Sequence, residues 1–317
     1  MHDQKAEMFR IAENLEISFS PAEAELKYLS LNKLKSVDLL PEMLIMVRAS
    51  ISSKTFSYKR KQIKVMDKGL VISFQNLLNV DDENNSSARS IDNGPHVRIT
   101  PSHLESEVLF TRDTHLQQIT ILVELEYLKR FAGIDQDKLY YLFDAEKTFW
   151  IEEFLSPDMV LVLGQLNELS SDSLLSQAHY RIKALELIYM LFVNLLRRES
   201  REHRDLSREE INAVYIARNY IANMLQRAPS KEELIRLSGM NELKLRRIFR
   251  QVFGKGIYEY YNYIRMQEAG RMLKMNNLSV SEVGYKLGFS NLSYFGRLFE
   301  KHYGLKPKKW QHQNAKQ

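Results

Sequence analysis

The C-terminal part of the chain contains the stretch Val283-Gly-Tyr-Lys-Leu-Gly-Phe-Ser-Asn-Leu-Ser-Tyr-Phe-Gly-Arg-Leu-Phe-Glu-Lys301. A short segment with helical periodicity precedes Gly288, and a longer one follows Ser290. Glycine tolerates the positive φ that ends a helix, and a serine side chain accepts an N–H group at the start of the next helix. The stretch therefore predicts a helix, a tight turn and a second helix, which together form a helix-turn-helix motif.

The same pattern occurs a second time earlier in the chain. Residues 233–241 align with residues 282–290, a shift of 49 positions. After one inserted residue, residues 247–254 align with residues 297–304. In the earlier copy, Asn241 takes the capping position that we assign to Ser290 in the later one. A single helix-turn-helix pattern is a weak signal, whereas two copies in the same order are a strong one.

These repeats predict an all-α DNA-binding domain at residues 209–317. Its two helix-turn-helix motifs are expected at about 230–253 and 279–302. Between them, residues 257–275 have the periodicity of one continuous helix. Such a helix is a stiff spacer, and it would hold the two recognition helices about 34 Å apart, so that both enter successive major grooves.

Charge is unevenly distributed along the chain. From Arg208 onwards there are 20 Lys and Arg residues against 9 Asp and Glu, a net charge of +11, whereas the preceding residues carry 25 against 31, a net charge of −6. A basic third joined to an acidic body is typical of a polyanion-binding module attached to a regulatory domain. The charge alone is weak evidence for the type of polyanion. Together with the repeated motif, it makes double-stranded DNA the expected one.

The first 124 residues consist mainly of short β-branched or apolar runs between polar breakers. These runs lie at residues 43–50, 55–65, 69–74, 96–100, 104–111 and 118–123. Several short strands at this spacing predict a small β-barrel or sandwich. The polar tract at residues 81–95 has no periodicity and predicts a long loop.

From Glu126 the periodicity becomes helical, and Ser156-Pro157-Asp158 is a helix start signal. The strongest helix spans about 176–198. Its broad apolar face at residues 182–196 packs either on the domain's own core or in a dimer seam, and both alternatives stay open. The charged segment that follows predicts a domain boundary.

We therefore predict an effector-binding and dimerisation domain at residues 1–200 and a linker at residues 201–208. Within this first domain, strands are expected at about 15–124 and helices at about 125–199.

The segment from about residue 213 to residue 310 resembles the DNA-binding domain of the AraC/XylS family of bacterial transcription regulators. The resemblance is carried by residues 229–239, 245–254, 264–269, 283–301 and 304–307. Gly284 stands where the family usually has alanine, and Gly296 stands where a small polar residue is common. The N-terminal two-thirds is more distantly similar to the cupin-like effector domains of that family, and residues 183–191 resemble the siderophore-responsive, pyochelin-regulator type.

The resemblance implies an α+β chain in which a cupin-like β-barrel with a helical hairpin precedes an all-α double helix-turn-helix domain. It also implies a cytoplasmic, sequence-specific regulator that forms a homodimer and activates transcription with RNA polymerase. A small-molecule effector bound in the N-terminal domain would control it. The alternative is a constitutive or protein-partner-controlled regulator that has no small-molecule ligand.

The candidate DNA contacts lie on the two recognition helices. Leu245, Ile248 and Phe249 are expected to face the core of the first motif, and Tyr294, Phe295, Leu298 and Phe299 the core of the second. Arginine suits base readout because its planar fork bonds guanine O6 and N7 together. The candidates are Glu242, Leu243, Arg246, Arg247, Arg250, Asn291, Leu292, Ser293, Arg297 and Lys301, with Lys306, Lys308 and Lys309 as further phosphate neighbours. For this group, the resemblance points to Leu243, Arg246 and Arg247 as base contacts. A solvated charged face is the plain alternative.

Several other classes of protein are disfavoured. The chain has no cysteine, which excludes disulfides, thiolate zinc sites and cysteine nucleophiles. His96, His103 and His115 form no tight pair, so positions in loops or on the surface are favoured over metal ligation. The sequence also lacks the zinc-protease, nucleophile-elbow and phosphate-loop motifs, so we expect neither an enzyme nor a cofactor. We expect no membrane span and no secretory signal.

Overall fold

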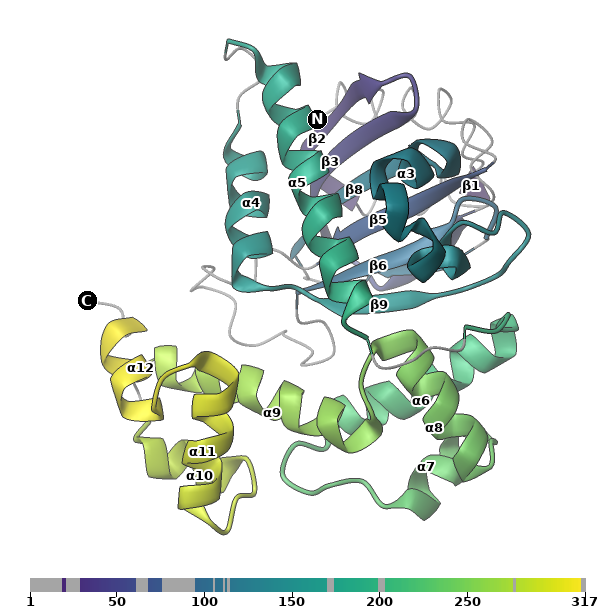
Figure 1. The fold of residues 1–317 in the computed structure, drawn as a ribbon. Coiled ribbons are helices and arrows are strands. Elements are labelled where there is room, and N and C mark those ends of the chain that lie inside the picture. The colour runs from purple at the N-terminus through teal and green to yellow at the C-terminus, as the bar shows by residue number, and fades with distance from the viewer. Residues whose placement is uncertain are drawn as a thin grey trace. The chain divides into compact units, whose positions relative to one another are not determined.

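The computed structural model describes residues 19–20, 29–60, 68–75, 95–104, 106–110, 112, 115–169, 174–198, 203–275 and 278–314. They form two compact units, which divide between Leu206 and Ser207. The first unit combines antiparallel sheets with helices, and the second is helical throughout its described residues (Figure 1). The chain is therefore an α+β protein. No helix in the described part is long and apolar enough to cross a membrane.

A six-stranded antiparallel sheet forms the base of the N-terminal unit, with the strand order β2-β3-β8-β5-β6-β9. Its strands are β2 (Leu29–Leu40), β3 (Met43–Ser52), β8 (His115–Glu124), β5 (Gly69–Gln75), β6 (His96–Pro101) and β9 (Ile151–Phe154). A second sheet has the order β1-β4-β7 and contains β1 (Phe19–Ser20), β4 (Phe56–Arg60) and β7 (Ser106–Phe110). Among these described strands neither sheet closes on itself, so a closed cupin-like barrel is not confirmed.

All six strand runs predicted from the sequence overlap an observed strand, but three of the described strands lie outside these runs. The first two, β1 and β9, have only two and four residues. The third is the edge strand β2, in which the register shifts between Leu31 and Lys33 and again between Asp38 and Leu40. Such bulges break the alternation of apolar and polar residues on which strand prediction rests. The predicted loop at residues 81–95 lies, except for Pro95, outside the described residues.

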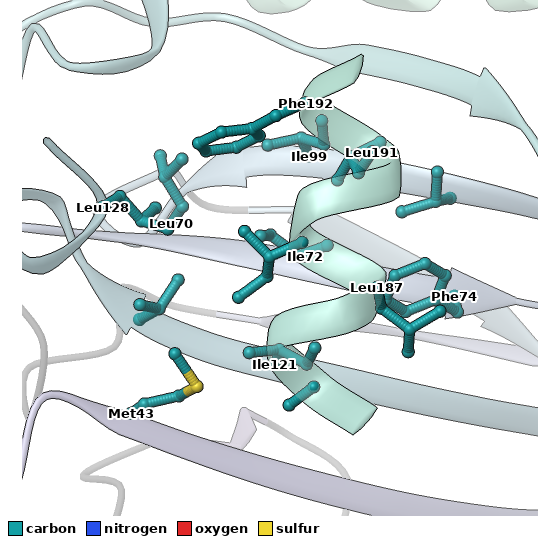
Figure 2. Packing of buried hydrophobic residues seen from close by; sticks show 14 of the residues in the cluster. Met43, Leu70, Ile72, Phe74, Ile99, Ile121, Leu128, Leu187, Leu191 and Phe192 are labelled. Atoms are coloured by element: carbon teal, nitrogen blue, oxygen red, sulfur yellow. The ribbon is translucent and has the colours of Figure 1, made fainter. Parts of the chain in front are cut away.

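Helices cover one face of the six-stranded sheet (Figure 1). They are α3 (Leu125–Ala132), the 3-10 helix η4 (Gly133–Leu142), α4 (Pro157–Glu168) and α5 (Ser176–Leu196). As expected, Ser156 caps the start of α4, because its hydroxyl accepts the N–H of Met159 at 3.2 Å. Figure 2 shows Leu187 and Leu191 of α5 packed over Ile72, Phe74 and other apolar residues of the sheet, and this layer is the core of the unit.

The end of this unit includes part of the segment in which a linker is expected. The ring of His203 stacks on that of Tyr141 with centroids 3.5 Å apart. The N–H of Leu206 donates to the carbonyl of Thr148 at 3.1 Å, and the Leu206 side chain is buried. Residues 203–206 therefore pack within the N-terminal unit.

The C-terminal unit contains two pairs of helices joined by a longer one. Its helices are α6 (Arg208–Asn223), α7 (Lys231–Ser238), α8 (Glu242–Phe253), α9 (Ile257–Lys274), α10 (Val280–Lys286), α11 (Leu292–Tyr303) and α12 (Pro307–Asn314). The pairs α7–α8 and α10–α11 fall where the two helix-turn-helix motifs are predicted, and α9 is the predicted continuous helix between them.

Candidate nucleic-acid interface

The first helix-turn-helix motif is built from local signals that the sequence shows. Ser230 and Glu233 form a capping box at the start of α7, in which each side chain bonds the backbone N–H of the other residue, at 3.2 and 2.9 Å. The helix ends at Gly239, which has a φ of +65°. Asn241 then caps α8, because its side-chain oxygen accepts the N–H of Lys244 at 2.9 Å.

The second motif repeats this design with one difference in the turn. Ser279 and Glu282 form the capping box of α10, and Gly288 follows the helix with a φ of +77°. The cap of α11 is Asn291, whose side-chain oxygen accepts the N–H of Tyr294 at 2.9 Å. The prediction that Ser290 is the cap is therefore wrong. The one-residue insertion between the two copies lies in this turn and moves the helix start to the next residue.

Contacts with α9 hold the second turn in place. Arg265 is buried and donates through Nη2 and Nε to the carbonyl oxygen of Leu287, at 2.7 and 3.2 Å. Its guanidinium also lies over the ring of Phe289, 3.5 Å from the centroid. Since α9 has 18 residues, it is about 27 Å long at 1.5 Å per residue. The turn of the second motif is thereby fixed to a straight spacer that starts beside the first motif.

The first recognition helix, α8, has the two faces that the sequence predicts. Leu245, Ile248 and Phe249 are buried in the core of the motif. The opposite side exposes Arg246, Arg247 and Arg250. Leu243 is also on this side and is 78% exposed, which is unusual for a leucine that serves only the fold. The side chains proposed to meet DNA are thus free of the core.

Glu242 forms ion pairs with two basic residues at the N-terminal end of this exposed face. A carboxylate oxygen of Glu242 lies 2.6 Å from Nζ of Lys231, and the other lies 3.4 Å from Nη1 of Arg246. The hydrogen bond from Lys231 is the main reason that the pKa of Glu242 lies below its ordinary value. Lys231, the first residue of α7, was not among the sequence candidates. Its position directly after the capping residue Ser230 was the signal that could have found it.

The second recognition helix, α11, matches its prediction only in part. Phe295 and Phe299 are fully buried, and Leu298 packs against the same core. The prediction that Tyr294 belongs to this core is wrong, because the residue is 38% exposed. Its pKa is raised, first by the burial of part of the ring and then by Tyr258, whose hydroxyl is hydrogen-bonded to it. Tyr258, in the first turn of α9, is a second exposed tyrosine that the helical pattern did not single out.

Leu292 differs from the other candidates on α11 because it packs toward α10. A Cβ atom added to Gly284 would lie only 2.6 Å from Cδ2 of Leu292. The glycine that replaces the usual alanine of the resembling family thus makes room for this leucine. The remaining candidates on this helix and its cap, Asn291, Ser293, Arg297 and Lys301, are exposed, as are Lys306, Lys308 and Lys309.

In the N-terminal unit the sequence offers His96, His103 and His115 as metal ligands and Phe56, Tyr58 and Phe74 as aromatic residues of a pocket. It favours loop or surface positions for the histidines and core positions for the aromatic residues. The favoured loop or surface position is wrong for His96, which lies in β6 and is buried, with Nε2 3.6 Å from a carboxylate oxygen of Glu152. Phe74 belongs to the core beneath α5. The side chains of His115, Phe56 and Tyr58 lie outside the described residues. In the described part of the chain, no three histidine, aspartate or glutamate side chains are placed to hold a metal ion.

The geometry of α7–α8 and α10–α11 defines the C-terminal unit as a double helix-turn-helix domain. Residues 234–313 match the family model described as "Helix-turn-helix domain". The chain is 31% identical over 83 residues to the HTH-type transcriptional regulator GlxA of Rhizobium meliloti (strain 1021), which covers 26% of each chain. It is 30% identical over 96 residues to the HTH-type transcriptional activator RhaR of Enterobacter sp. (strain 638), which covers 30% of this chain and 34% of that one.

The resemblance to the AraC/XylS family is thereby confirmed for the C-terminal unit, whose residues 234–313 match a helix-turn-helix domain. The chain spans only about a quarter to a third of the length of these two curated relatives. Among solved structures, a probable AraC family transcriptional regulator from Rhodopseudomonas palustris CGA009 is 25% identical. That match covers 33% of this chain and 99% of that chain, with a TM-score of 0.31.

Proposed function

We propose that the chain is a sequence-specific regulator of transcription that binds double-stranded DNA through its C-terminal unit. The observation that carries this proposal is the pair of helix-turn-helix motifs on one spacer. The first recognition helix exposes Arg246, Arg247 and Arg250, and the second exposes Arg297. The net charge of +11 from Arg208 onwards supports it, because phosphate neutralisation supplies much of the affinity for DNA. A chromosomal target implies a cytoplasmic protein.

On the first recognition helix we assign base contacts to Leu243, Arg246 and Arg247. A bidentate arginine–guanine pair discriminates by about 1–3 kcal/mol, and an exposed leucine suits the methyl group of thymine. Glu242 positions Arg246 through their ion pair, and Arg250 contacts phosphate. On the second motif, Asn291, Leu292, Ser293, Arg297 and Lys301 complete the interface. Of these, Arg297 is the main base or backbone contact.

The test measures binding of the full chain to the intergenic DNA upstream of its own gene at several salt concentrations. Arg246→Ala and Arg247→Ala should each lose specific binding while keeping a salt-dependent, non-specific component. Arg130→Ala is the matched control, because this exposed arginine lies in the N-terminal unit and pairs with Glu42 at 3.3 Å. Binding that ignores both DNA sequence and the two recognition arginines would contradict the proposal.

We further propose that the chain acts as a homodimer through the outer side of α5. The inner side of this helix packs on the core, whereas Ile182 and Tyr189 are 62% and 61% exposed. With Leu196, also exposed, they recur every seven residues, which is the spacing of a helix–helix seam. Tyr189→Glu should give a monomer in sedimentation experiments. Tyr140→Glu, at an exposed tyrosine of η4, should leave the dimer intact.

Regulation completes the proposal: a small molecule bound in the N-terminal unit controls the DNA-binding unit, and the complex activates transcription with RNA polymerase. The name of the RhaR relative, a transcriptional activator, supports the sign of the effect. In transcription reactions with purified RNA polymerase, the protein should raise the yield from its target promoter, and a ligand should change that yield. Repression of the promoter would reverse the assigned sign.

A further inference from the structure

Two exposed tyrosines connect the spacer helix of the C-terminal unit to its second recognition helix. Tyr258 is in the first turn of α9, and Tyr294 is in the first turn of α11. They are 60% and 38% exposed, and their hydroxyl groups are hydrogen-bonded to each other. We call these two residues the tyrosine pair.

Arginines of both recognition helices flank the tyrosine pair. A Cβ atom added to Gly256, two residues before Tyr258, would lie 3.4 Å from Nη2 of Arg250, so this side chain of α8 reaches the start of α9. On the other side, Arg297 follows Tyr294 by three residues on α11 and therefore lies on the same face of that helix. The tyrosine pair thus lies between an exposed arginine of the first recognition helix and one of the second.

Two guanidinium groups lie near the hydroxyl groups of the pair. Burial of part of the ring and the neighbouring tyrosine raise the pKa of Tyr294, and the positive charges of Arg265 and Arg297 oppose that shift. Glu259, the next residue along α9 from the pair, has its carboxylate 3.1 Å from Nζ of Lys255. Surroundings with two nearby cations favour a hydrogen-bond acceptor that carries negative charge.

The tyrosine pair has a hydroxyl proton for a partner from outside the chain. A phenol hydroxyl carries one proton and can also accept a hydrogen bond. Within the pair one hydroxyl donates to the other, so the accepting hydroxyl keeps its own proton for a further acceptor. Tyr258 is the more exposed of the two and is better placed to meet that acceptor. Its ring buries little apolar surface, so it contributes little to the core.

The position of the pair between the recognition helices selects the part of DNA that it can meet. Two recognition helices that enter successive major grooves on one side of a duplex leave the minor groove between them. Phosphates and sugars of the two strands border that groove. Tyrosine hydroxyls are among the side-chain groups that donate to DNA phosphates. A donor at this place therefore meets the backbone and not the base edges of the major groove.

We propose that the tyrosine pair binds a phosphate group of the DNA backbone between the two major grooves. Tyr258 donates to a phosphate oxygen, and Tyr294 positions Tyr258 through their hydrogen bond. The inference rests on the proposed function, because it requires both motifs to bind one duplex. The contact adds affinity for any DNA sequence and fixes where the spacer lies along the duplex.

The test measures binding of the full chain to the intergenic DNA upstream of its own gene and to unrelated DNA of equal length, at several salt concentrations. Tyr258→Phe removes the hydroxyl and keeps the ring. We expect its affinity to fall about tenfold on both DNAs, because a hydrogen bond to a charged acceptor is lost. The salt dependence should not change, because a neutral donor releases no counterion.

Two further variants distinguish donor from positioning residue and provide the control. Tyr294→Phe should weaken binding less than Tyr258→Phe, because the donating hydroxyl remains. Tyr140→Phe changes a 48% exposed tyrosine of the N-terminal unit and should bind both DNAs like the wild type. A larger loss in Tyr294→Phe than in Tyr258→Phe would overturn the assigned roles.

Tyr258→Lys gives a readout that a merely structural role would not move. An ammonium group at this position neutralises one phosphate, so the slope of log affinity against log salt should become steeper by about 0.9. The same substitution at Tyr140 should leave the slope unchanged. An unchanged slope in Tyr258→Lys would overturn the proposal, as would a lower melting temperature of the C-terminal unit in Tyr258→Phe.

Failure of this inference is separable from failure of the proposed function. If the wild type binds its target through Arg246 and Arg247, and Tyr258→Phe binds equally well, only the phosphate contact is lost. A loss confined to the target sequence would also overturn the inference, because it would make Tyr258 a base contact. A wild-type chain without specific DNA binding would overturn both proposals.

Discussion

Replacing Gly288 by alanine will destabilise the C-terminal unit far more than the same substitution at Gly239. Both glycines end the first helix of a motif at positive φ, where an L-residue costs about 1–2 kcal/mol. At Gly239 nothing lies within 4 Å of an added Cβ, so the cost ends there. At Gly288 the Cβ would lie 1.9 Å from the backbone oxygen of Gln226, which cannot rotate away as a side chain can.

Relief of that contact requires a movement of the segment that precedes α7. This segment is anchored one residue earlier, where the carbonyl of Leu225 accepts the hydroxyl of Tyr261 at 3.1 Å. Leu225 also belongs to the core of the second motif. We therefore expect a total loss of about 4 kcal/mol or more for Gly288→Ala, at the upper end of single substitutions.

The two tryptophans allow the units to be followed separately. Trp150 lies in the N-terminal unit, and Trp310 lies in the C-terminal unit, packed on Phe299 and Tyr303. Fluorotryptophan labelling with fluorine NMR in a urea series should show the Trp310 transition at lower urea in both variants, and much lower in Gly288→Ala. The Trp150 transition serves as an internal control. Equal losses at the two glycines would refute the role of the contact with Gln226.

Three further predictions use the same measurement. Gly296→Ala should stabilise the C-terminal unit by about 1 kcal/mol. An alanine at this position has a higher helix propensity than glycine, and its Cβ would have no neighbour within 4 Å. Gly164→Ala should stabilise the N-terminal unit alone, for the same reason. A lower stability of Gly296→Ala would contradict the absence of neighbours around this position. Burial lowers the pKa of His302 from 6.5 to about 4, so stability should fall by about 3 kcal/mol as the pH drops between these values, and His302→Gln should remove that dependence. The bond from the backbone N–H of Ser230 is the main reason that the pKa of Glu233 lies at about 2, so its stabilising effect is complete above pH 4.5 and lost toward pH 2. In Glu233→Gln the urea midpoint of the Trp310 transition should depend less on pH between 4.5 and 2. An unchanged pH dependence would contradict the role assigned to Glu233.

The candidate interface was accessible to sequence reasoning wherever its signals are local. The buried positions of α8 repeat with helical periodicity, so the exposed side that carries Arg246 and Arg247 follows directly. Tyr294 shows where that reasoning fails. A helical pattern assigns Tyr294 to the core, but the residue is 38% exposed, and its hydroxyl is hydrogen-bonded to Tyr258, from a helix that begins far earlier in the chain.

By itself the sequence determined that this protein has two helix-turn-helix motifs, with the Asn241 cap of the first recognition helix, the glycine turns and the continuous helix between the motifs. These features depend on residues three or four positions apart, and such short-range interactions are visible in any single copy of the pattern. Because the pattern occurs twice, each copy supports the interpretation of the other as a helix-turn-helix motif.

Only the tertiary structure decided which long-range contacts complete these elements. The backbone of Gln226 leaves no room for a Cβ atom at Gly288, Gly284 makes room for Leu292, and Arg265 is hydrogen-bonded to a turn 22 residues further along the chain. In the N-terminal unit, Arg48 and Gln118 likewise become neighbours only when β3 pairs with β8. Strand pairing and helix packing join residues whose separation along the chain leaves no periodic trace, and these contacts determine which buried polar groups meet.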